Sequence, residues 1–288
     1  MNPLFVASIN ELQIALCRQL MQSGSEVDPR GSRTREVLGF SFEIENPRNR
    51  LTTLPVRRWS PALAVAELAW HIRGDDDVLP LAFYAPRWRE FADADGLVRG
   101  SCYGARIFKS LDGKSSQWAN VRRLLTQDPF SRRAVLNFRM DEDVSRDTND
   151  VSCTNVLQFI IRENRLHAFV SMRSNDAIWG VPYDVFFFTS FQELMALELG
   201  VDLGSYRHYA ASMHVYERHF DLADQIALSK CTESGEMPPM EAPAHVYALA
   251  REEEHLRVSG IRSGAAIGGY GEFCLEMLLT HKSLAIAA

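Results

Sequence analysis

One cysteine, Cys153, stands among small polar residues in the stretch DVSCTNVLQF, just before a segment with the apolar content of a β-strand. A thiol in this setting can fill the core, form half of a disulfide, bind a metal or act as a nucleophile. The five cysteines are odd in number, widely spaced and without a CxxC pair, so neither a disulfide framework nor a metal site is expected. Two interpretations of Cys153 remain: a small buried side chain, or a nucleophilic thiolate.

Several polar side chains interrupt otherwise apolar segments, and each has an ordinary structural explanation. Glu67 can be a surface carboxylate, Asp184 can cap its helix, and His214 can be a core histidine with a hydrogen-bond partner. Buried polar groups need partners, however, and a bound ligand can be that partner. Together, a thiol, two carboxylates, several arginines and a His-Tyr pair favour a thiolate that attacks a phosphorylated small molecule. The set comprises Glu67, Arg132, Arg133, Cys153, Arg173, Ser174, Asn175, Asp176, Asp184, His214 and Tyr216.

The segments that carry these residues predict one α+β domain over residues 1–288. Helical and strand patterns alternate irregularly, without a Gly-rich phosphate loop, repeated βαβ units or a dividing linker. The segment YDVFFFTSFQELMALELG is apolar on nearly every side, which predicts a central buried helix. The predicted helices cover residues 1–23, 60–74, 115–128, 183–200 and 246–258, and residues 26–35 are expected to form a loop. The predicted strands cover residues 36–44, 132–140, 155–162, 165–174 and the start of 206–229.

The overall composition restricts the partners of the chain. Its 288 residues are 46% hydrophobic and 24% charged, which is typical of a soluble globular protein. The formal charge of −6 argues against binding to polymeric nucleic acid, although a local arginine cluster can still bind one phosphate. The sequence has no signal-peptide pattern, and no apolar run approaches the roughly 18 residues of a membrane-spanning helix. We therefore expect a cytoplasmic protein without a membrane segment.

Four motifs, in this order and at these separations, resemble the thymidylate synthase superfamily: DPFSRR, CTNVLQF, MRSNDAIWGVPYD and MHVYERHF. The sequence is most similar to the phage-type deoxycytidylate and cytidylate 5-hydroxymethylases. It has VSCTN, MRSND and PYD where synthases usually carry PPCH, QRS-x-D and PFN. The resemblance runs from the loop before LGFSFEI to about Asp224, and the last 60 or so residues diverge from the family. It implies a mixed sheet packed with helices and a homodimer formed through that sheet.

The resemblance implies folate-dependent one-carbon transfer to C5 of a cytidine monophosphate, either dCMP or CMP. Cys153 corresponds to the thiolate that adds to C6 and makes C5 nucleophilic, and 5,10-methylenetetrahydrofolate is the implied donor. Glu67 corresponds to the catalytic glutamate, which moves protons and orders water. Asp184 stands where synthases have an asparagine. A carboxylate accepts a hydrogen bond from N4 of cytosine and, when protonated, shares its proton with N3, so Asp184 favours cytosine over uracil.

The remaining matched positions divide between the nucleotide and the folate. The guanidinium group of arginine binds phosphate oxygens well. In the N-terminal loop, Arg30 is the matched phosphate-binding residue and Arg33 is the alternative. The implied nucleotide-binding residues are Arg30, Arg132, Arg133, Arg173, Ser174, Asn175, Asp184, His214 and Tyr216. Of these, Arg132 and Arg133 are expected to reach the partner subunit's site, while His214 and Tyr216 hold the sugar 3′-hydroxyl. The implied folate-binding residues are Trp88, Tyr103 and Asp176.

The sequence leaves the product and the sugar open. Water added to the C5 methylene gives 5-hydroxymethylcytidylate, whereas hydride gives 5-methylcytidylate and dihydrofolate. The motifs favour water, but Trp88 matches a synthase tryptophan that packs near the reacting carbon, which keeps the methyl product as an alternative. Thr154 stands where synthases have a histidine. No motif reports whether the sugar is ribose or deoxyribose.

Three rival functions also stay open. The first is a uridylate enzyme with the same fold, against which Asp184 argues. The second is a thiol hydrolase, which needs His167 or His214 to approach Cys153 as a general base. The third is a protein that uses the fold only to bind a nucleotide or RNA, for which Cys153 has no chemical role.

Overall fold

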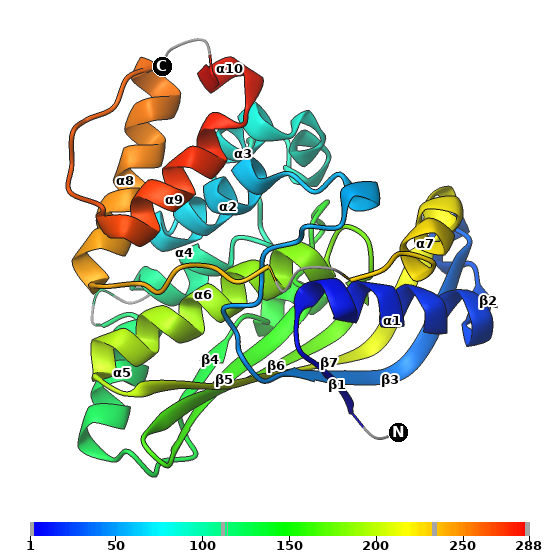
Figure 1. Ribbon diagram of the computed structural model, residues 1–288, viewed down its shortest axis with the longest axis horizontal. Coiled ribbons are helices and arrows are strands. Elements are labelled where there is room, and N and C mark those ends of the chain that lie inside the picture. The colour runs from blue at the N-terminus through cyan, green and yellow to red at the C-terminus, as the bar shows by residue number, and fades with distance from the viewer. Residues whose placement is uncertain (1–2, 111–112, 114, 232–234, 286–288) are drawn as a thin grey trace.

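A seven-stranded mixed β-sheet forms the base of the molecule, and helices cover one of its faces (Figure 1). The computed structural model describes residues 3–110, 113, 115–231 and 235–285. The strands follow the order β1-β3-β7-β6-β5-β4, and β2 pairs with β3. The β1–β3 and β6–β7 pairs are parallel, and the other pairs are antiparallel. The strands are β1 (Leu4–Val6), β2 (Ser25–Val27), β3 (Thr34–Ile44), β4 (Val135–Asn137), β5 (Thr154–Arg162), β6 (Arg165–Asp176) and β7 (Asp202–Tyr216).

Two layers of helices lie over the sheet. Helices α1 (Ile9–Ser23) and α6 (Val181–Leu199) pack directly on it. Helix α2 (Pro61–Arg73) lies over α6 and is covered in turn by α8 (Pro243–Ser259) and α9 (Gly268–Leu279) (Figure 1). This mixed sheet packed with helices confirms the predicted α+β class. The other helices are α3 (Leu79–Tyr84), α4 (Tyr103–Phe108), α5 (Gln117–Gln127), α7 (Phe220–Ala227) and α10 (Lys282–Ala285), with 3₁₀ turns η1 (Pro29–Gly31), η2 (Pro55–Arg57), η3 (Pro86–Phe91), η4 (Asp141–Val144) and η5 (Glu217–His219).

The hairpin between β5 and β6 follows directly from its turn residues. Glu163 and Asn164 both have positive φ angles, 51° and 57°, and Arg162 pairs with Arg165 across the turn. Two residues with positive φ make the tight turn that matches the twist of antiparallel strands. The predicted hairpin is therefore confirmed, and it brings the start of β5 beside the end of β6.

Helix α2 has clear start and stop signals. The Ser60 side chain accepts a hydrogen bond from Leu63 N (3.2 Å), Pro61 opens the helix, and Gly74 ends it with a φ of 71°. Because α6 packs on one side of α2 and α8 and α9 pack on the other, both Glu67 and His71 are buried. A polar side chain in this helix therefore faces protein rather than solvent.

Three predicted boundaries are wrong. The helix expected over residues 1–23 begins only at Ile9, because Ser8 caps it and Leu4–Val6 pairs with β3. The loop expected over residues 26–35 contains part of β2 and the start of β3. The strand expected over residues 132–140 shortens to β4, which lies at the sheet edge and pairs only with β5 in the part of the chain that the structure describes.

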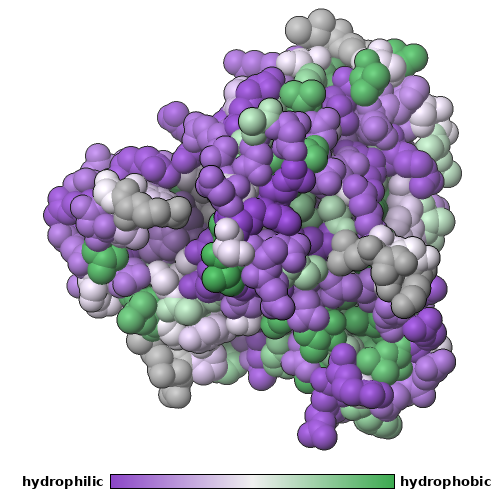
Figure 2. All heavy atoms as spheres, turned by 180° about the vertical axis from the view of Figure 1, so that it is seen from behind, coloured by the Kyte–Doolittle hydropathy of each residue, from purple (hydrophilic) through white to green (hydrophobic). Residues whose placement is uncertain are grey.

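The second face of the sheet carries no helix among the described residues (Figure 1). Alternation along the strands turns apolar side chains toward this face as well, and Leu38 and Tyr209 are 67% and 44% exposed. Seen from behind, the molecule is mostly hydrophilic, and hydrophobic side chains gather toward its lower edge, where the sheet lies (Figure 2). No helix in the described ranges is both long and apolar enough to cross a bilayer.

Candidate active site

Cys153 lies at the end of the loop that precedes β5, and the backbone around it is tied down. Its carbonyl oxygen accepts a hydrogen bond from Arg173 N (2.9 Å), which joins the loop to β6. The N–H of Thr154 donates to Tyr103 Oη (3.4 Å). Ser174 Oγ donates toward Cys153 Sγ at 3.8 Å. The half-buried thiol therefore has a defined position between the start of β5 and the end of β6.

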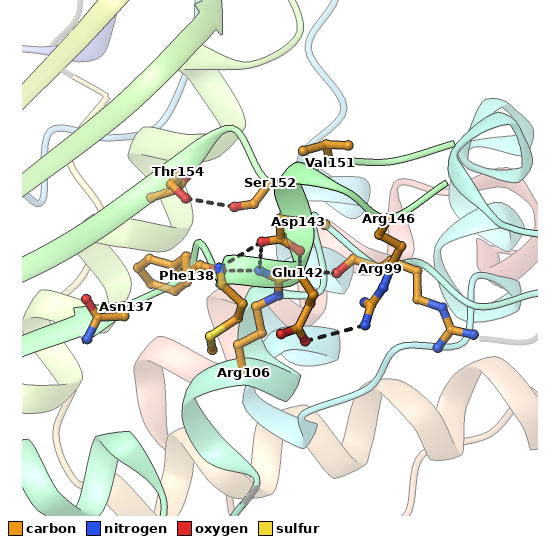
Figure 3. Close-up of polar contacts among 12 residues, drawn as sticks. Arg99, Arg106, Asn137, Phe138, Glu142, Asp143, Arg146, Val151, Ser152 and Thr154 are labelled. Atoms are coloured by element: carbon orange, nitrogen blue, oxygen red, sulfur yellow. Dashed lines mark hydrogen bonds and ion pairs between the residues drawn. The ribbon is translucent and has the colours of Figure 1, made fainter. Parts of the chain in front are cut away.

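A buried ion pair holds the segment that leads to this loop (Figure 3). Arg106 of α4 donates to both carboxylate oxygens of Asp143, at 2.5 and 2.8 Å, and also to the carbonyl oxygen of Phe138. Ser152 Oγ donates to the carbonyl oxygen of Thr154 (2.7 Å). Fixing the backbone on both sides of the cysteine orients the thiol before any ligand binds.

Burial and positive charge act in opposite directions on the thiol. Burial raises the pKa of Cys153 above its usual value, while the Arg173 guanidinium and the Ser174 hydroxyl lower it. Burial is the larger effect, and the Arg173 charge is the larger of the two that oppose it. Arg173 also donates to the carbonyl oxygens of Ser152 (2.9 Å) and Val151 (3.0 Å), so it supports the cysteine loop.

Two buried carboxyl groups, Glu67 of α2 and Asp184 of α6, neighbour each other on the helical side of the site. Burial raises the pKa of Glu67 to about 8, and the neighbouring Asp184 carboxyl adds to this rise. Burial also raises the pKa of Asp184 to about 7, although a hydrogen bond from Asn175 lowers it. The charge of Asp184 reaches Cys153 too, whose pKa it raises. Both carboxyl groups therefore change protonation near neutral pH, as acid–base groups must.

Asp184 is not the cap of its helix. Gly180 is the N-cap of α6, and the backbone N–H of Asp184 already donates to the Gly180 carbonyl oxygen (2.9 Å). The turn into α6 is instead made by Asp176, whose Oδ1 accepts from Ile178 N (2.7 Å) and Trp179 N (3.3 Å). The ordinary explanation of Asp184 as a capping residue is therefore wrong, and its buried carboxyl group is available to a ligand.

The ends of β6 and β7 bring a further polar row to the same place. Asp176 pairs with His214 in the parallel register, and burial lowers the pKa of His214. The rings of His214 and Tyr216 meet edge to face at 5.1 Å. Asn175 is buried and its amide lies 3.3 Å from His208 Nε2, which fixes its orientation behind Asp184. These side chains form one wall of the candidate site.

Tyr103 and Trp88 lie on the helical side of the site. Burial raises the pKa of Tyr103, and the charges of Cys153 and Asp184 add to that rise, so the phenol stays protonated. Trp88 packs against the ring of Trp70 at a centroid distance of 6.0 Å. The matched residues whose charges or hydrogen bonds reach Cys153 or its backbone are Tyr103, Arg173, Ser174 and Asp184. Further matched residues join this cluster through these four or through one another: Glu67, Asn175, Asp176, His214 and Tyr216.

Arg132 and Arg133 lie away from the thiol of their own chain. Both are exposed in the loop before β4, and the carbonyl oxygen of Arg132 accepts a hydrogen bond from Gln158 Nε2 (2.8 Å). Gln158 is four residues along β5 from Thr154, which corresponds to about 13 Å. In one subunit these arginines are therefore not part of the cluster around Cys153.

The N-terminal arginines differ in what they contact. The backbone of Arg30 lies in η1, and its side chain is outside the described part of the structure. Its rival Arg33 forms surface ion pairs with Glu26 (2.8 Å) and Glu217 (2.6 Å). Arg33 is therefore already engaged by carboxylates, which weakens it as a phosphate ligand.

The arrangement argues against a hydrolase that uses His167 as its base. His167 Nδ1 bonds to Ser205 Oγ (3.1 Å), and the residue lies six positions before Arg173 on β6, about 20 Å along the strand. The described sulfur contacts of Cys153 are to Ser174 and Val151. Among the described residues, no group of three or more metal-binding side chains is placed to hold a metal ion.

Several residues that border the site are not among those predicted from the sequence. Trp179 is 42% exposed, and the guanidinium groups of Arg57 and Arg87 lie 5.2 and 6.0 Å from its ring. His71 lies one helical turn after Glu67 and is fully buried. The spacing of four residues was the available signal for His71. Trp179 had no signal beyond its position in the MRSNDAIWGVPYD motif.

Two cavities, of about 690 and 490 Å³, lie away from Cys153. The larger one is lined by Arg165, Asp202 and Leu203, at the opposite ends of β6 and β7 from the thiol, and by residues of α6 and the segment after β3. The smaller one lies beside the C-terminal end of α2. The cluster of reactive side chains, rather than a large cavity, therefore locates the candidate site.

A family model described as thymidylate synthase matches residues 13–258. The chain is 32% identical over 221 residues to the deoxyuridylate hydroxymethyltransferase of Bacillus phage SP01, which covers 72% of this chain and 56% of that protein. It is 29% identical over 235 residues to the deoxycytidylate 5-hydroxymethyltransferase of Enterobacteria phage T4, which covers 75% of this chain and 89% of that protein. The chain thus spans little more than half the length of the SP01 protein.

A solved structure supports the same assignment of fold. The structure of thermostable thymidylate synthase A from Bacillus subtilis superimposes with a TM-score of 0.67 at 24% sequence identity. The match covers 78% of this chain and 85% of that chain. At this level of identity the likeness concerns the fold.

Proposed function

The chain belongs to the thymidylate synthase family, and we propose that it transfers a one-carbon unit from 5,10-methylenetetrahydrofolate to C5 of a cytidine monophosphate, giving 5-hydroxymethylcytidylate. The observation that carries the proposal is the oriented thiol of Cys153 near the carboxyl group of Asp184, which in turn neighbours the buried carboxyl group of Glu67. A pyrimidine attacked at C6 needs a thiolate at one carbon and proton-carrying groups near its polar edge. The two phage relatives, named as hydroxymethyltransferases of deoxyuridylate and deoxycytidylate, support this class of reaction.

Cys153 starts the reaction by adding to C6, which converts C5 into an enamine-like carbon. Because burial keeps the free thiol protonated, the proton must leave as the nucleotide binds. Arg173 and Ser174 favour this change, since both stabilise the thiolate more than the thiol. We propose that Glu67, in its ionised form, orders the water that adds to the C5 methylene and takes up the proton of that water. The C6–S bond then breaks, which releases Cys153 and the product.

Asp184 is the proposed reader of the base. A carboxyl group with a pKa of about 7 can accept from the N4 amino group and share a proton with N3 of cytosine. Sharing that proton withdraws electrons from the ring and makes C6 more reactive toward the thiolate. The bond from Asn175 keeps the carboxyl group oriented. His214 and Tyr216 are proposed to hold the sugar 3′-hydroxyl.

The residues beside the site have the chemistry that a folate needs. The half-exposed ring of Trp179, flanked by Arg57 and Arg87, presents an aromatic surface with positive charge, which suits a flat pterin and its attached carboxylates. Trp88, Tyr103 and Asp176 are the other proposed folate contacts. When bound, methylenetetrahydrofolate supplies the one-carbon unit as an electrophile.

The alternative product is 5-methylcytidylate, which requires that water be excluded from C5. Trp88 favours this alternative, because it packs against Trp70 on the helix that carries Glu67 and can shield the reacting carbon. The two products differ in mass, so a single experiment separates them.

We expect a cytidylate to gain the elements of formaldehyde when the protein is incubated with methylenetetrahydrofolate and an equimolar mixture of CMP, dCMP, UMP and dUMP. Mass spectrometry of the nucleotides is the measurement, and it also identifies the sugar. A gain of only a methylene group would establish the methyl alternative. Reaction of the uridylates alone would contradict the role given to Asp184, and no reaction at all would contradict the proposed enzyme.

The uncovered face of the sheet is the proposed interface of a homodimer. Half-buried apolar side chains such as Val156, Ile160 and Phe169 point to it, together with Leu38 and Tyr209. An apolar sheet face without a covering layer is unfavourable in water. In the proposed dimer, Arg132 and Arg133 of each subunit reach the phosphate in the partner's site.

This shared site predicts complementation between two inactive proteins. We expect an Arg132→Ala/Arg133→Ala protein and a Cys153→Ser protein each to have little activity. After mixing under conditions that exchange subunits, half of the dimers are heterodimers, and each of these has one intact site. Activity should therefore recover to about a quarter of the wild-type value. The measurement is the rate of product formation before and after exchange, and no recovery would assign these arginines to their own subunit or exclude the dimer.

A further inference from the structure

His71 is a fully buried histidine whose tautomer is fixed by the backbone of a neighbouring helix. Its Nδ1 accepts a hydrogen bond from the N–H of Gly104 at the start of α4 (3.2 Å). Burial lowers the pKa of His71 to about 3, so the ring is neutral. A neutral imidazole that accepts at Nδ1 carries its proton on Nε2. His71 therefore offers one N–H donor to the interior.

This donor has no hydrogen-bond partner among the residues that the structure describes. Nε2 of His71 is buried and unsatisfied, and Glu67 Oε1 lies 3.9 Å away, one helical turn earlier on α2. The distance is too long for a hydrogen bond, and because the ring is neutral the contact is not an ion pair. A buried donor without an acceptor is unfavourable, so a native structure that keeps one has a reason to do so.

The surroundings prevent the imidazole from turning to another acceptor. A Cβ atom at Gly104 would lie 1.8 Å from the carbonyl oxygen of His71, so only glycine lets α4 come close enough to bind Nδ1. The ring stacks on Tyr103 at 5.6 Å and contacts Phe187 at 4.8 Å. The packing of three helices, α2, α4 and α6, therefore fixes the direction of the Nε2–H group.

We propose that His71 is a positioning residue that donates its Nε2–H to the carboxylate of Glu67 when the nucleotide binds, and so fixes the orientation and the protonation of that carboxylate. The inference rests on the catalytic role proposed for Glu67. The 3.9 Å gap closes by a small rotation of the glutamate, and hydrogen bonds of this kind are often long before substrate is bound. The remaining titratable groups that face Glu67 or His71 are Asp184 and Tyr183 of α6 and Tyr103 of α4.

The Nε2–H donor of His71 and the charge of Asp184 change the pKa of Glu67 in opposite directions. The charge of Asp184 raises the pKa of Glu67, whereas a neutral N–H donor stabilises the ionised carboxylate and lowers that pKa. Removing the donor should therefore raise the pKa of Glu67. The limb of the pH–rate profile that reports Glu67 then moves to higher pH, whether the active form of the glutamate is ionised or protonated.

Two substitutions of His71 distinguish the loss of the Nε2–H donor from a change in packing. In His71→Asn, the amide oxygen replaces Nδ1 as the acceptor for Gly104, and the donor toward Glu67 is lost. In His71→Gln, the amide nitrogen reaches the position of Nε2 and keeps that donor. We expect His71→Asn to move the Glu67 limb upward by about one pH unit and to slow the reaction about tenfold near neutral pH, while His71→Gln stays within a few-fold of wild type.

The pH dependence is measured for product formation and for exchange of the C5 hydrogen with deuterated solvent, which needs nucleotide but no folate. Glu67→Gln identifies the relevant limb because it removes it. Equal behaviour of the two His71 variants, with an unmoved limb, would overturn the proposal and leave His71 a packing residue.

A second measurement needs neither turnover nor a His71 variant. In ¹⁵N-histidine spectra of the wild-type protein, we expect His71 to stay neutral with its proton on Nε2, and its Nε2–H resonance to shift when CMP or dCMP binds. That shift should be absent in Glu67→Leu, which has no acceptor. A shift that persists unchanged in Glu67→Leu overturns the proposed contact, whereas a wild-type protein that binds nucleotide but makes no product contradicts only the proposed function.

Discussion

Cys153→Ser should lower the rate of product formation by about 10⁴-fold or more, because a serine hydroxyl at this position has no base strong enough to make it a nucleophile. The same substitution should abolish exchange of the C5 hydrogen, since that exchange requires addition at C6. Both rates are measured, by mass spectrometry of the product and by NMR of the nucleotide in deuterium oxide. Binding of the nucleotide should change far less, because Arg173, His214 and Tyr216 are untouched.

The matched control is Cys231→Ser, which replaces an exposed thiol outside the site and should leave both rates within a factor of two of wild type. Thermal unfolding of the two variants separates loss of chemistry from loss of fold. A Cys153→Ser protein that keeps its activity would return the cysteine to the core and favour a binding function for the fold. Ester or amide cleavage without folate would favour the hydrolase.

Local chemistry made parts of this fold predictable. Glu163 and Asn164 accept positive φ angles and stand between two apolar runs, so their hairpin could be predicted from a few residues. The start of α1 could not, because Leu4–Val6 is a strand only through its pairing with β3, some 38 residues later. Three apolar residues before a helix carry no information about a partner that distant.

The same distinction holds for the site. The motifs around Cys153 and Asp184 are contiguous, and the hairpin with the parallel β6–β7 pair brings them together. The only local signal for His71 is its spacing of four residues from Glu67 on the same helix. The role proposed for it depends on the close approach of α4 through Gly104, which is a property of packing that the sequence does not show. Whether the pKa of Cys153 is raised or lowered likewise depends on how deeply the thiol is buried, which the sequence does not show.

The second large effect concerns the choice of base. We expect Asp184→Asn to change the ratio of kcat/KM for cytidylate to that for uridylate by about 10- to 100-fold in favour of uridylate. The neutral amide of asparagine has an N–H donor and a separate oxygen acceptor. These groups match the O4 acceptor and the N3–H donor of uracil, whereas they cannot share a proton with N3 of cytosine as the carboxyl group of Asp184 can. The ratio is measured with both nucleotides in one reaction, so that differences in the amount of folded protein cancel.

Asp176→Asn is the control, because that carboxylate accepts from the backbone of Ile178 and Trp179. It should lower both rates and leave their ratio unchanged. An unchanged ratio in Asp184→Asn as well would remove Asp184 as the reader of the base, and the SP01 relative, named for deoxyuridylate, would then be the better guide to the substrate.

Asp184→Asn should also change how the stability of the protein depends on pH, and this effect needs no substrate. The folded pKa of Asp184, about 7, lies above its usual value of 3.8, so folding favours the protonated form. Wild type therefore loses stability as pH rises from about 4 to 7, and above pH 7 the full cost of the buried charge is present. Asp184→Asn lacks this cost, so the difference in melting temperature should shift in favour of the variant between pH 4.5 and pH 8. A difference independent of pH would mean that Asp184 is ionised at low cost in the free protein, and that any proton shared with cytosine must come from another group.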